Sequence, residues 1–414
     1  MTGTPAEGPP TRFGARFVLV VGSSAFYFLG VGLLTPVLPR YVENVLHGGG
    51  LEVGVVVGAF AVSAAMMRSF VGRLGDRRGR RLLVVSGCTI AGLSVLGYGL
   101  DGLATIVLMR LLTGAGEAAV FVGAATTAQD LAPGERRGQA ASLFSIAIYS
   151  GIAIGPPIGE WVYHHHGAHT VWAVSSVLCL IGAVLGTSFP KWALGPPRRV
   201  VGGPRPKFLH PAALRPGVVL MLGALGYAGF ASFVPLYADR IGLKGAGPVF
   251  VEYAVIVLAV RIVGARVPDV LGPRRGPLLA LALQTCGLAV MGAWASPAGL
   301  YTSTAVYASG VSLLYPALFP MVVDHAPEQE RSHAIATFSL FFDVSQGLGS
   351  LLLGAVVAAT NEQGAFLAAG AASAAGWWLH QRSRWPGRAV PAGPVATPAV
   401  GAPARPSNVG GPLP

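Results

Sequence analysis

Charged side chains inside long apolar segments are the residues of this sequence best placed to do chemistry. Arg110 and Glu117 lie in one such segment, and Asp343 lies in another. Burying a charge in hydrocarbon costs about 2.5–3.5 kcal/mol on insertion scales, so each side chain must face other parts of the protein. Arg110 and Glu117 share one helical face but lie about 10 Å apart along it. A water, a substrate or another segment must therefore bridge them.

We interpret Glu117 and Asp343 as residues that handle protons or substrate charge, and Arg110 as the cation that couples to them. A carboxyl group that is buried in one conformation and faces a cation in another can load and release a proton. The alternative interpretation is that both acids are structural, satisfied by Arg110, by the backbone or by other hydrogen bonds inside the bundle.

Apolar segments must position these charges, and the composition indicates that lipid surrounds them. The chain has 414 residues, of which 53% are hydrophobic and 11% charged, and its mean hydropathy is +0.61. A soluble domain carries about 25% charged residues. Twelve segments are long enough to cross a bilayer as helices, so we predict an all-α polytopic membrane protein. They are residues 16–39, 51–72, 82–100, 103–130, 138–162, 168–188, 215–238, 247–266, 277–295, 298–323, 333–358 and 363–381.

The basic residues are distributed unevenly between the loops. The net charge is +12, and most of the 29 Lys and Arg residues fall on one side of the alternating segments. Only Arg40, Arg240 and Lys244 fall in the opposite loops. Because basic loops stay in the cytoplasm, we predict a cell (inner or plasma) membrane protein with both termini cytoplasmic. This placement argues against a nucleic-acid surface.

A basic turn, Gly72 to Arg81, lies between two apolar segments and recurs in weaker form 193 positions later. The repeat-related pairs are Arg68 and Arg261, Asp76 and Asp269, Gly79 and Gly272, and Arg81 and Arg274. The repeat predicts two pseudo-symmetric six-helix halves. We expect an N-terminal tail (1–15), an N-terminal bundle (16–188), a cytoplasmic linker (189–214), a C-terminal bundle (215–381) and a disordered tail (382–414).

The turn is interpreted as an inner gate that latches the halves while the outer side is open. Asp76 is predicted to cap the helix that begins near His333, and Asp130, at a helix C-terminus, is predicted to pair with Arg77 or Arg80. Arg68 is assigned to this region and not to the substrate site. The alternative is that the arginines only set topology. The gate residues are Gly72, Asp76, Arg77, Gly79, Arg80, Arg81 and Asp130.

Gly151, Gly155 and Gly159 recur every four residues and form a smooth stripe on one helix. Small residues allow close helix approach in membranes, and Pro156 removes a helix hydrogen bond and bends the segment. We expect the stripe to pack against segment 247–266 of the other half as a bendable outer seam. The alternative is static packing.

Other functional classes find little support in the residues. His164, His165 and His166 point in different directions around a helix, so no metal site is predicted. The sequence has no phosphate-binding Gly-x-x-x-x-Gly-Lys-Ser/Thr loop and no set of nucleophile and base that predicts catalysis. We therefore expect no enzyme activity and no cofactor, with a proton gradient as the energy source.

Four motifs resemble those of the major facilitator superfamily, and within it the twelve-span drug:proton antiporter-like group. They are Gly72 to Arg81, Arg110 to Gly116, Gly151 to Gly159, and Pro36 to Pro39. Glu160 stands where the third of these motifs usually has its final glycine. The resemblance extends over about residues 14–381.

The resemblance implies a secondary active transporter that exports a small organic molecule, such as a drug or a secondary metabolite, in exchange for protons by alternating access. Its partners would be this substrate, protons and the lipid bilayer, with a monomer as the functional unit. Two alternatives stay open. One is a proton-coupled importer or facilitator of a metabolite with the same fold, and the other is a non-transporting membrane receptor or a membrane enzyme.

Overall fold

Apolar segments in lipid must satisfy their backbone hydrogen bonds internally, and here they do so as helices. The computed structural model describes residues 14–100, 102–132, 137–189, 209–263, 267–327 and 330–383, and these ranges contain helices and no strand. The elements are α1 (Ala15–Asn44), α2 (Gly50–Arg78), α3 (Arg80–Leu96), η1 (Gly97–Gly99, a 3-10 turn), α4 (Leu103–Asp130), α5 (Arg137–Gly186), α6 (Pro211–Arg240), α7 (Gly247–Val263), α8 (Val267–Ala293), α9 (Pro297–Asp324), α10 (Arg331–Ala359) and α11 (Glu362–Arg382).

Helix α5 consists of two spans. A continuous helix of its 50 residues would measure about 75 Å, more than twice the hydrocarbon thickness of a bilayer. Gly167 divides it with φ 79° and ψ 174°, a conformation that favours glycine. The two parts then lie at the same level of α1, because Gly32 packs against Gly155 of the first part and Gly30 against Ser175 of the second. The chain therefore folds back on itself at Gly167.

With α5 counted as two spans, each of the twelve expected segments coincides with a helix of the described chain, and the all-α polytopic fold is confirmed. Among the residues that the structure describes, nine helical stretches are long and apolar enough to cross a membrane, and one of them, 146–186, contains both parts of α5. The described residues fall in one compact unit, Met1–Ser383. The predicted linker lies largely outside the described residues, so its boundaries stay a prediction.

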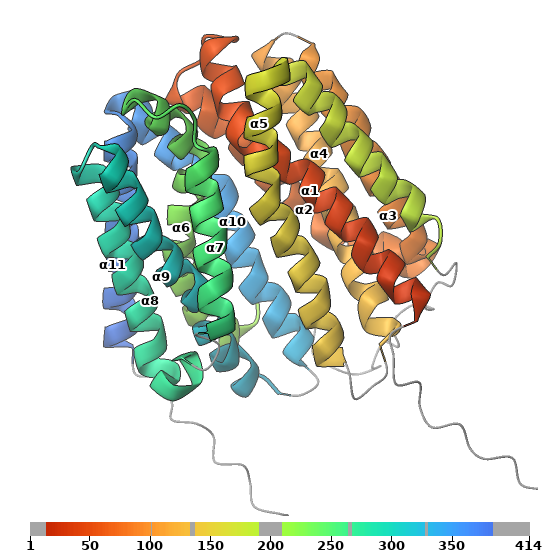
Figure 1. The fold of residues 1–414 in the computed structure, drawn as a ribbon. Coiled ribbons are helices and arrows are strands. Elements are labelled where there is room, and N and C mark those ends of the chain that lie inside the picture. Colours follow the sequence, from red (N-terminus) through yellow and green to blue (C-terminus); the bar gives the residue numbers. More distant parts are fainter. Residues whose placement is uncertain are drawn as a thin grey trace, which may run out of the picture. The chain divides into compact units, whose positions relative to one another are not determined.

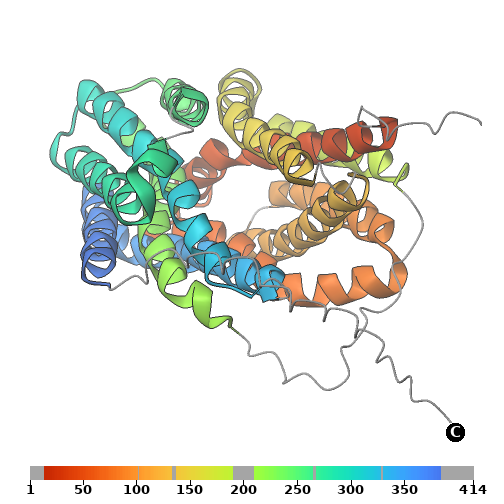
Figure 2. The ribbon, with the colours of Figure 1, turned by 90° about the horizontal axis from the view of Figure 1, so that it is seen from below.

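Helix packing repeats between the two halves. In the first half α2 and α3 both pack on α4, and in the second α7 and α8 both pack on α9. Helix α1 packs on α5, and its counterpart α6 packs on α10. The halves meet where α2 packs on α10 and where α5 packs on α7, two contacts that are themselves related by the repeat. The two groups are coloured red to yellow-green and green to blue (Figures 1 and 2).

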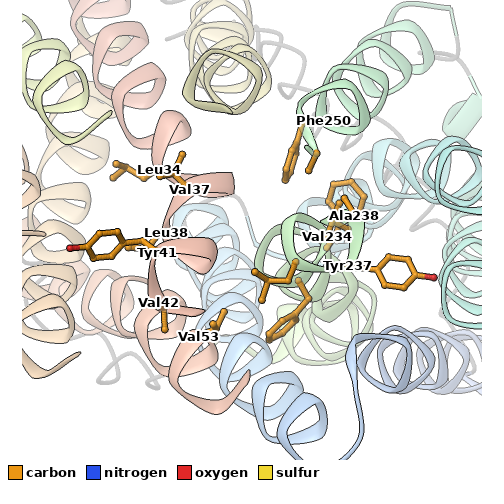
Figure 3. Packing of buried hydrophobic residues seen from close by; sticks show 14 of the residues in the cluster. Leu34, Val37, Leu38, Tyr41, Val42, Val53, Val234, Tyr237, Ala238 and Phe250 are labelled. Atoms are coloured by element: carbon orange, nitrogen blue, oxygen red, sulfur yellow. The ribbon is translucent and has the colours of Figure 1, made fainter. Parts of the chain in front are cut away.

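One hydrophobic core joins the halves near the end of the bundle where α1 ends and α2 begins, which we call the α1–α2 end. Its buried residues include Leu34, Val37 and Leu38 of α1, together with Val234 of α6 and Phe250 of α7. Figure 3 shows these side chains on facing helices. A second cluster lies toward the opposite end, which we call the α2–α3 end, and its described members all belong to the first half. Apolar packing thus closes the protein at the α1–α2 end.

Candidate transport site

Arg68 of α2 lies between two carboxylates that come from different halves. Its Nη1 atom is 2.8 Å from Asp343 Oδ2 on α10, and its Nη2 atom is 3.6 Å from Glu117 Oε1 on α4. The guanidinium also lies over the ring of Phe121, 4.8 Å from the centroid. A guanidinium over an aromatic face gains a further favourable electrostatic contact. One cation therefore serves two acids, and its shorter contact crosses between the halves.

These three side chains lie near the middle of their helices. Glu117 is fourteen residues from Leu103 and thirteen from Asp130, the two ends of α4. The side chains of Arg68, Glu117 and Asp343 are 24%, 9% and 12% exposed. Low exposure strengthens the electrostatic interaction and makes an unmatched charge costly. The site thus combines burial, mid-depth position and one more acidic than basic group.

Three buried atoms of the site have no hydrogen-bond partner within the described part of the chain. They are Glu117 Oε2, Arg68 Nε and Asp343 Oδ2, the last of which meets Arg68 Nη1 only as an ion pair. A buried polar atom without a partner costs about 1–3 kcal/mol. The site therefore keeps hydrogen-bonding capacity for a proton, a water or a ligand.

Arg110 was expected to be the coupling cation, but the structure gives it different partners. Its Nε donates to Val56 O over 3.2 Å and its Nη2 to Val57 O over 3.4 Å, both on α2. Its guanidinium also lies over the Phe60 ring, 4.6 Å from the centroid. These contacts neutralise no carboxylate, so Arg110 here joins α4 to α2 and does not reach Glu117.

The assignment of Arg68 to the inner gate is corrected by the same geometry. Helix α2 continues to Arg78, six residues past the predicted end of the segment, so Arg68 lies about 15 Å inside the helix terminus. The signal was present in the sequence, because Arg68 already fell inside the predicted segment 51–72. A charge inside an apolar segment is the criterion that singled out Arg110.

The basic turn contains a glycine with positive φ between two helices. Gly79 separates α2 from α3 with φ 91°, and its repeat partner Gly272 has φ 70°. Arg80 Nη1 contacts Asp130 Oδ2, which confirms the pairing predicted for the end of α4. The side chain of Asp76 lies outside the described residues, so its capping role stays a prediction.

The remaining residues predicted for the gate are not packed tightly against other described residues. Arg77 is exposed, and Arg81 and Gly72 are half-buried at the α2–α3 end. A Cβ built on Gly72 would meet no atom within 4 Å. The gating role of the turn is therefore still a prediction.

The glycine stripe of α5 packs on α1 of its own half, so the expected contact with segment 247–266 is wrong. A Cβ on Gly155 would lie 2.6 Å from Gly32 Cα, and one on Gly151 would lie 2.6 Å from Leu29 N. Gly159 approaches the Leu33 carbonyl in the same way. Pro156, next to the stripe, is buried within α5. The face of α5 toward α7 is a different one, because the rotation of a helix decides which stripe meets which neighbour.

Metal chemistry finds no ligand set in the described part of the chain. No three His, Cys, Asp or Glu side chains there form a group that could hold an ion. His165 Nδ1 instead lies 2.8 Å from Trp161 O, and His164 Nε2 lies 3.1 Å from Glu160 Oε1.

Comparison with known proteins identifies the fold family. The chain matches the sequence model of the Major Facilitator Superfamily over residues 20–297 and 246–409. The chain belongs to the Major Facilitator Superfamily. Among superfamily relatives, the uncharacterized MFS-type transporter STM4428 of Salmonella typhimurium is 28% identical over 361 residues, which span 84% of this chain and 91% of the relative. The uncharacterized MFS-type transporter YhhS of Escherichia coli is 26% identical over 372 residues, 86% of this chain and 90% of the relative.

Solved structures of the superfamily share the fold. A bacterial homolog of the human lysosomal transporter Spinster, in an inward-facing and occupied conformation, matches with a TM-score of 0.76 at 14% identity, over 91% of this chain and 98% of that one. The nucleoside transporter NupG matches with a TM-score of 0.69 at 14% identity, over 89% and 98%. At such identities the likeness concerns the fold alone. The match to the superfamily model and the MFS-type transporters among its relatives identify this chain as a multi-pass membrane transporter.

Proposed function

We propose that this superfamily member exports a small organic molecule, such as a drug or a secondary metabolite, in exchange for protons by alternating access. The single observation that carries the proposal is the Arg68 guanidinium between Glu117 of the first half and Asp343 of the second. A transporter that rocks two halves about a central site needs a charge contact there that proton or substrate binding changes.

The charge balance supplies the coupling. With both acids ionised, Arg68 leaves one negative charge unmatched at mid-depth, where charge is costly. Either a proton or the positive group of a substrate can neutralise it, and the two compete for the same carboxylates. A proton on Asp343 also weakens its contact with Arg68, the contact that joins the halves. Competition of this kind exchanges protons for substrate, which is the chemistry of an antiporter.

The direction of transport is proposed from the arrangement of the chain in the membrane. With the basic loops and both termini in the cytoplasm of a bacterial-type plasma membrane, the α1–α2 end faces outward. The Gly151 to Gly159 motif resembles that of exporters and supports this direction. The proposal includes two six-helix bundles joined by a cytoplasmic linker over 189–214, a functional monomer, and a proton gradient in place of a cofactor.

Everted membrane vesicles test the proposal. Respiration acidifies their interior, and acridine orange fluorescence is quenched in proportion to the gradient. A panel of organic cations and neutral compounds is added to vesicles that contain the wild-type protein or Asp343→Asn. We expect at least one compound to relieve the quench with the wild type and not with the variant. Radiolabelled uptake of that compound into the vesicles should stop when a protonophore removes the gradient, whereas gradient-driven release from the vesicles would indicate an importer.

A further inference from the structure

Two arginines at the α1–α2 end each contact carboxylates from both halves. They are Arg40 of α1 and Arg240 of α6, and their side chains are 2% and 51% exposed. Both lie on the side with few basic residues, where with Lys244 they are the only Lys or Arg residues in loops or helix ends. Lys and Arg residues in loops favour the cytoplasmic side, so an arginine that lies on the other side requires a structural or functional reason.

Arg40 forms the tighter of the two clusters. Its Nη1 lies 2.5 Å from Glu160 Oε1, on α5 of its own half. Its Nε and Nη2 donate to both carboxylate oxygens of Asp239, over 2.6 and 2.9 Å, and Asp239 belongs to α6 of the other half. Nη2 also donates to the carbonyl of Pro235 over 3.1 Å. A guanidinium that binds a carboxylate with two parallel bonds makes one of the stronger polar contacts in proteins.

Arg240 repeats this arrangement from the opposite side. Its Nη1 donates to Glu362 Oε2 over 2.7 Å, and Glu362 begins α11 of the same half. Its Nη2 donates to Glu43 Oε1 over 3.1 Å, and Glu43 lies on α1 of the other half. Each arginine therefore has one carboxylate from its own half and one from the other.

The two kinds of carboxylate differ in burial. Within each half, the side chains of Glu160 and Glu362 are 6% and 2% exposed. Across the halves, those of Asp239 and Glu43 are 43% and 32% exposed. Glu43 and Asp239 also occupy corresponding positions in the repeat, each four residues after a proline that ends the apolar part of its helix. The two clusters are thus reciprocal.

We propose that Arg40 and Arg240 form a paired latch that opens the α1–α2 end when the two arginines release, of their four carboxylates, only Asp239 and Glu43. Glu160 and Glu362 stay bound, so neither arginine is left without a counter-charge in the open state. Separation of a fully buried pair is costly, because it leaves an uncompensated charge out of water. Release of a half-exposed carboxylate costs less, because that carboxylate is already partly hydrated and water replaces the arginine. The proposal deepens the alternating-access transport proposed above and rests on it.

The backbone just before α7, in the second half, lies against the carboxylate of Glu160. Ala246, immediately before α7, donates its N–H to Glu160 Oε1 over 3.0 Å. Gly245 has φ 112°, and a Cβ there would lie 2.6 Å from the same oxygen. Glu160 is also the residue that replaces the usual last glycine of the motif in this helix. Its carboxylate thus anchors Arg40 and adds one further bond that opening must break.

Thiol labelling tests the latch in membranes without substrate or gradient. The probe is a methanethiosulfonate reagent, and the reporter is Val37→Cys, a fully buried position of the shared core, in a Cys286→Ser background that removes the exposed native thiol. We expect Asp239→Asn combined with Glu43→Gln to raise the labelling rate about tenfold, as expected when the open state gains about 1.4 kcal/mol. The melting temperature should stay near that of the parent.

The matched control is Glu52→Gln, which removes one negative charge at the same end. Glu52 accepts a hydrogen bond from Gly49 N of its own half. Its substitution should leave the labelling rate unchanged. Equal rates for the Asp239→Asn/Glu43→Gln protein and the Glu52→Gln protein would overturn the latch. A faster rate would support it whether or not the proton-exchange proposal survives, because the assay involves no transport.

A variant with exchanged charges distinguishes an arginine that is shared by two carboxylates from an arginine in a simple salt bridge with one. In the combined variant Glu43→Arg and Arg240→Glu, the contact between the halves is restored with opposite signs, but the new glutamate faces the buried Glu362. We expect labelling to remain fast and the melting temperature to fall below that of Glu43→Gln alone. Full recovery of both values would show that Glu362 plays no part, and would overturn the paired arrangement.

Discussion

Removal of the Arg68 guanidinium is predicted to destabilise the protein, because two buried acids lose their common cation. With Arg68 in place the side chains of Glu117 and Asp343 are only 9% and 12% exposed, and in Arg68→Ala no other cation replaces the guanidinium beside them. Removing one partner of a buried ion pair costs about 3–5 kcal/mol. Because Arg68 is itself 24% exposed and its contact with Glu117 is long, we expect a loss near the lower limit, about 3 kcal/mol.

Most of this loss should come from the stranded carboxylates and not from the missing contacts of the arginine. The triple variant Arg68→Ala, Glu117→Gln, Asp343→Asn removes the cation and both negative charges together. It should recover about 2 kcal/mol relative to Arg68→Ala, since neutral amides are cheaper to bury than ionised acids. The interaction between the three side chains then appears as a difference between the stability change of the triple variant and the sum of the changes of the single variants.

The assay is reversible unfolding in mixed micelles, with an increasing fraction of sodium dodecyl sulfate and tryptophan fluorescence as the signal. Arg73→Ala is the matched control, because Arg73 is an exposed residue of the same helix. Its free energy of unfolding should stay within about 0.5 kcal/mol of the wild type. If Arg68→Ala were as stable as this control, or the triple variant no more stable than Arg68→Ala, the reasoning about the central site would be refuted.

Three further substitutions separate packing, backbone and charge effects in the same titration. Gly155→Ala forces a methyl group against the α1 backbone and should lower the free energy of unfolding by about 1–3 kcal/mol. Its control is Gly22→Ala, whose Cβ would meet only one side-chain atom at 3.8 Å and should change stability little. Equal stability of the two variants would contradict the close α1–α5 contact. Gly79→Ala places a side chain at φ 91° and should lower stability by about 1–2 kcal/mol. Arg110→Met loses two backbone hydrogen bonds but strands no carboxylate, so its cost should be about 1–2 kcal/mol and smaller than that of removing Arg68; a larger loss would show that Arg110 has an acidic partner.

The fold could be predicted because its causes are local to the sequence. Apolar length decides where a helix can cross lipid, and the repeat of Gly79 at Gly272 reappears as the same left-handed backbone in both halves. A pairing of Asp130 with Arg77 or Arg80 also followed, because a carboxylate at a helix C-terminus needs a cation and the basic turn supplies one. The structure selects Arg80.

The partners of the charged site could not be predicted in the same way. Asp343 lies 275 positions from Arg68, and no spacing along one helix brings them together. Which face of α5 meets which neighbour depends on the rotation of the helix, so the Gly151 to Gly159 stripe was assigned to the wrong partner. Arg40 carried a usable signal, since an arginine on the side with few Lys and Arg residues requires a nearby acid, but the sequence did not indicate which one.

Distances between the halves, measured by pulsed electron paramagnetic resonance, test the central claim most directly. One pair of nitroxides is placed at the α1–α2 end on Val45→Cys and Lys244→Cys, and another at the α2–α3 end on Arg16→Cys and Arg215→Cys, all exposed positions in a background without native cysteines. The comparison is between the parent and Asp343→Asn, which mimics the protonated acid. The account predicts that the substitution shifts the two distance distributions in opposite directions, one end opening while the other closes. Distributions that stay unchanged, or that shift in the same direction, would contradict it.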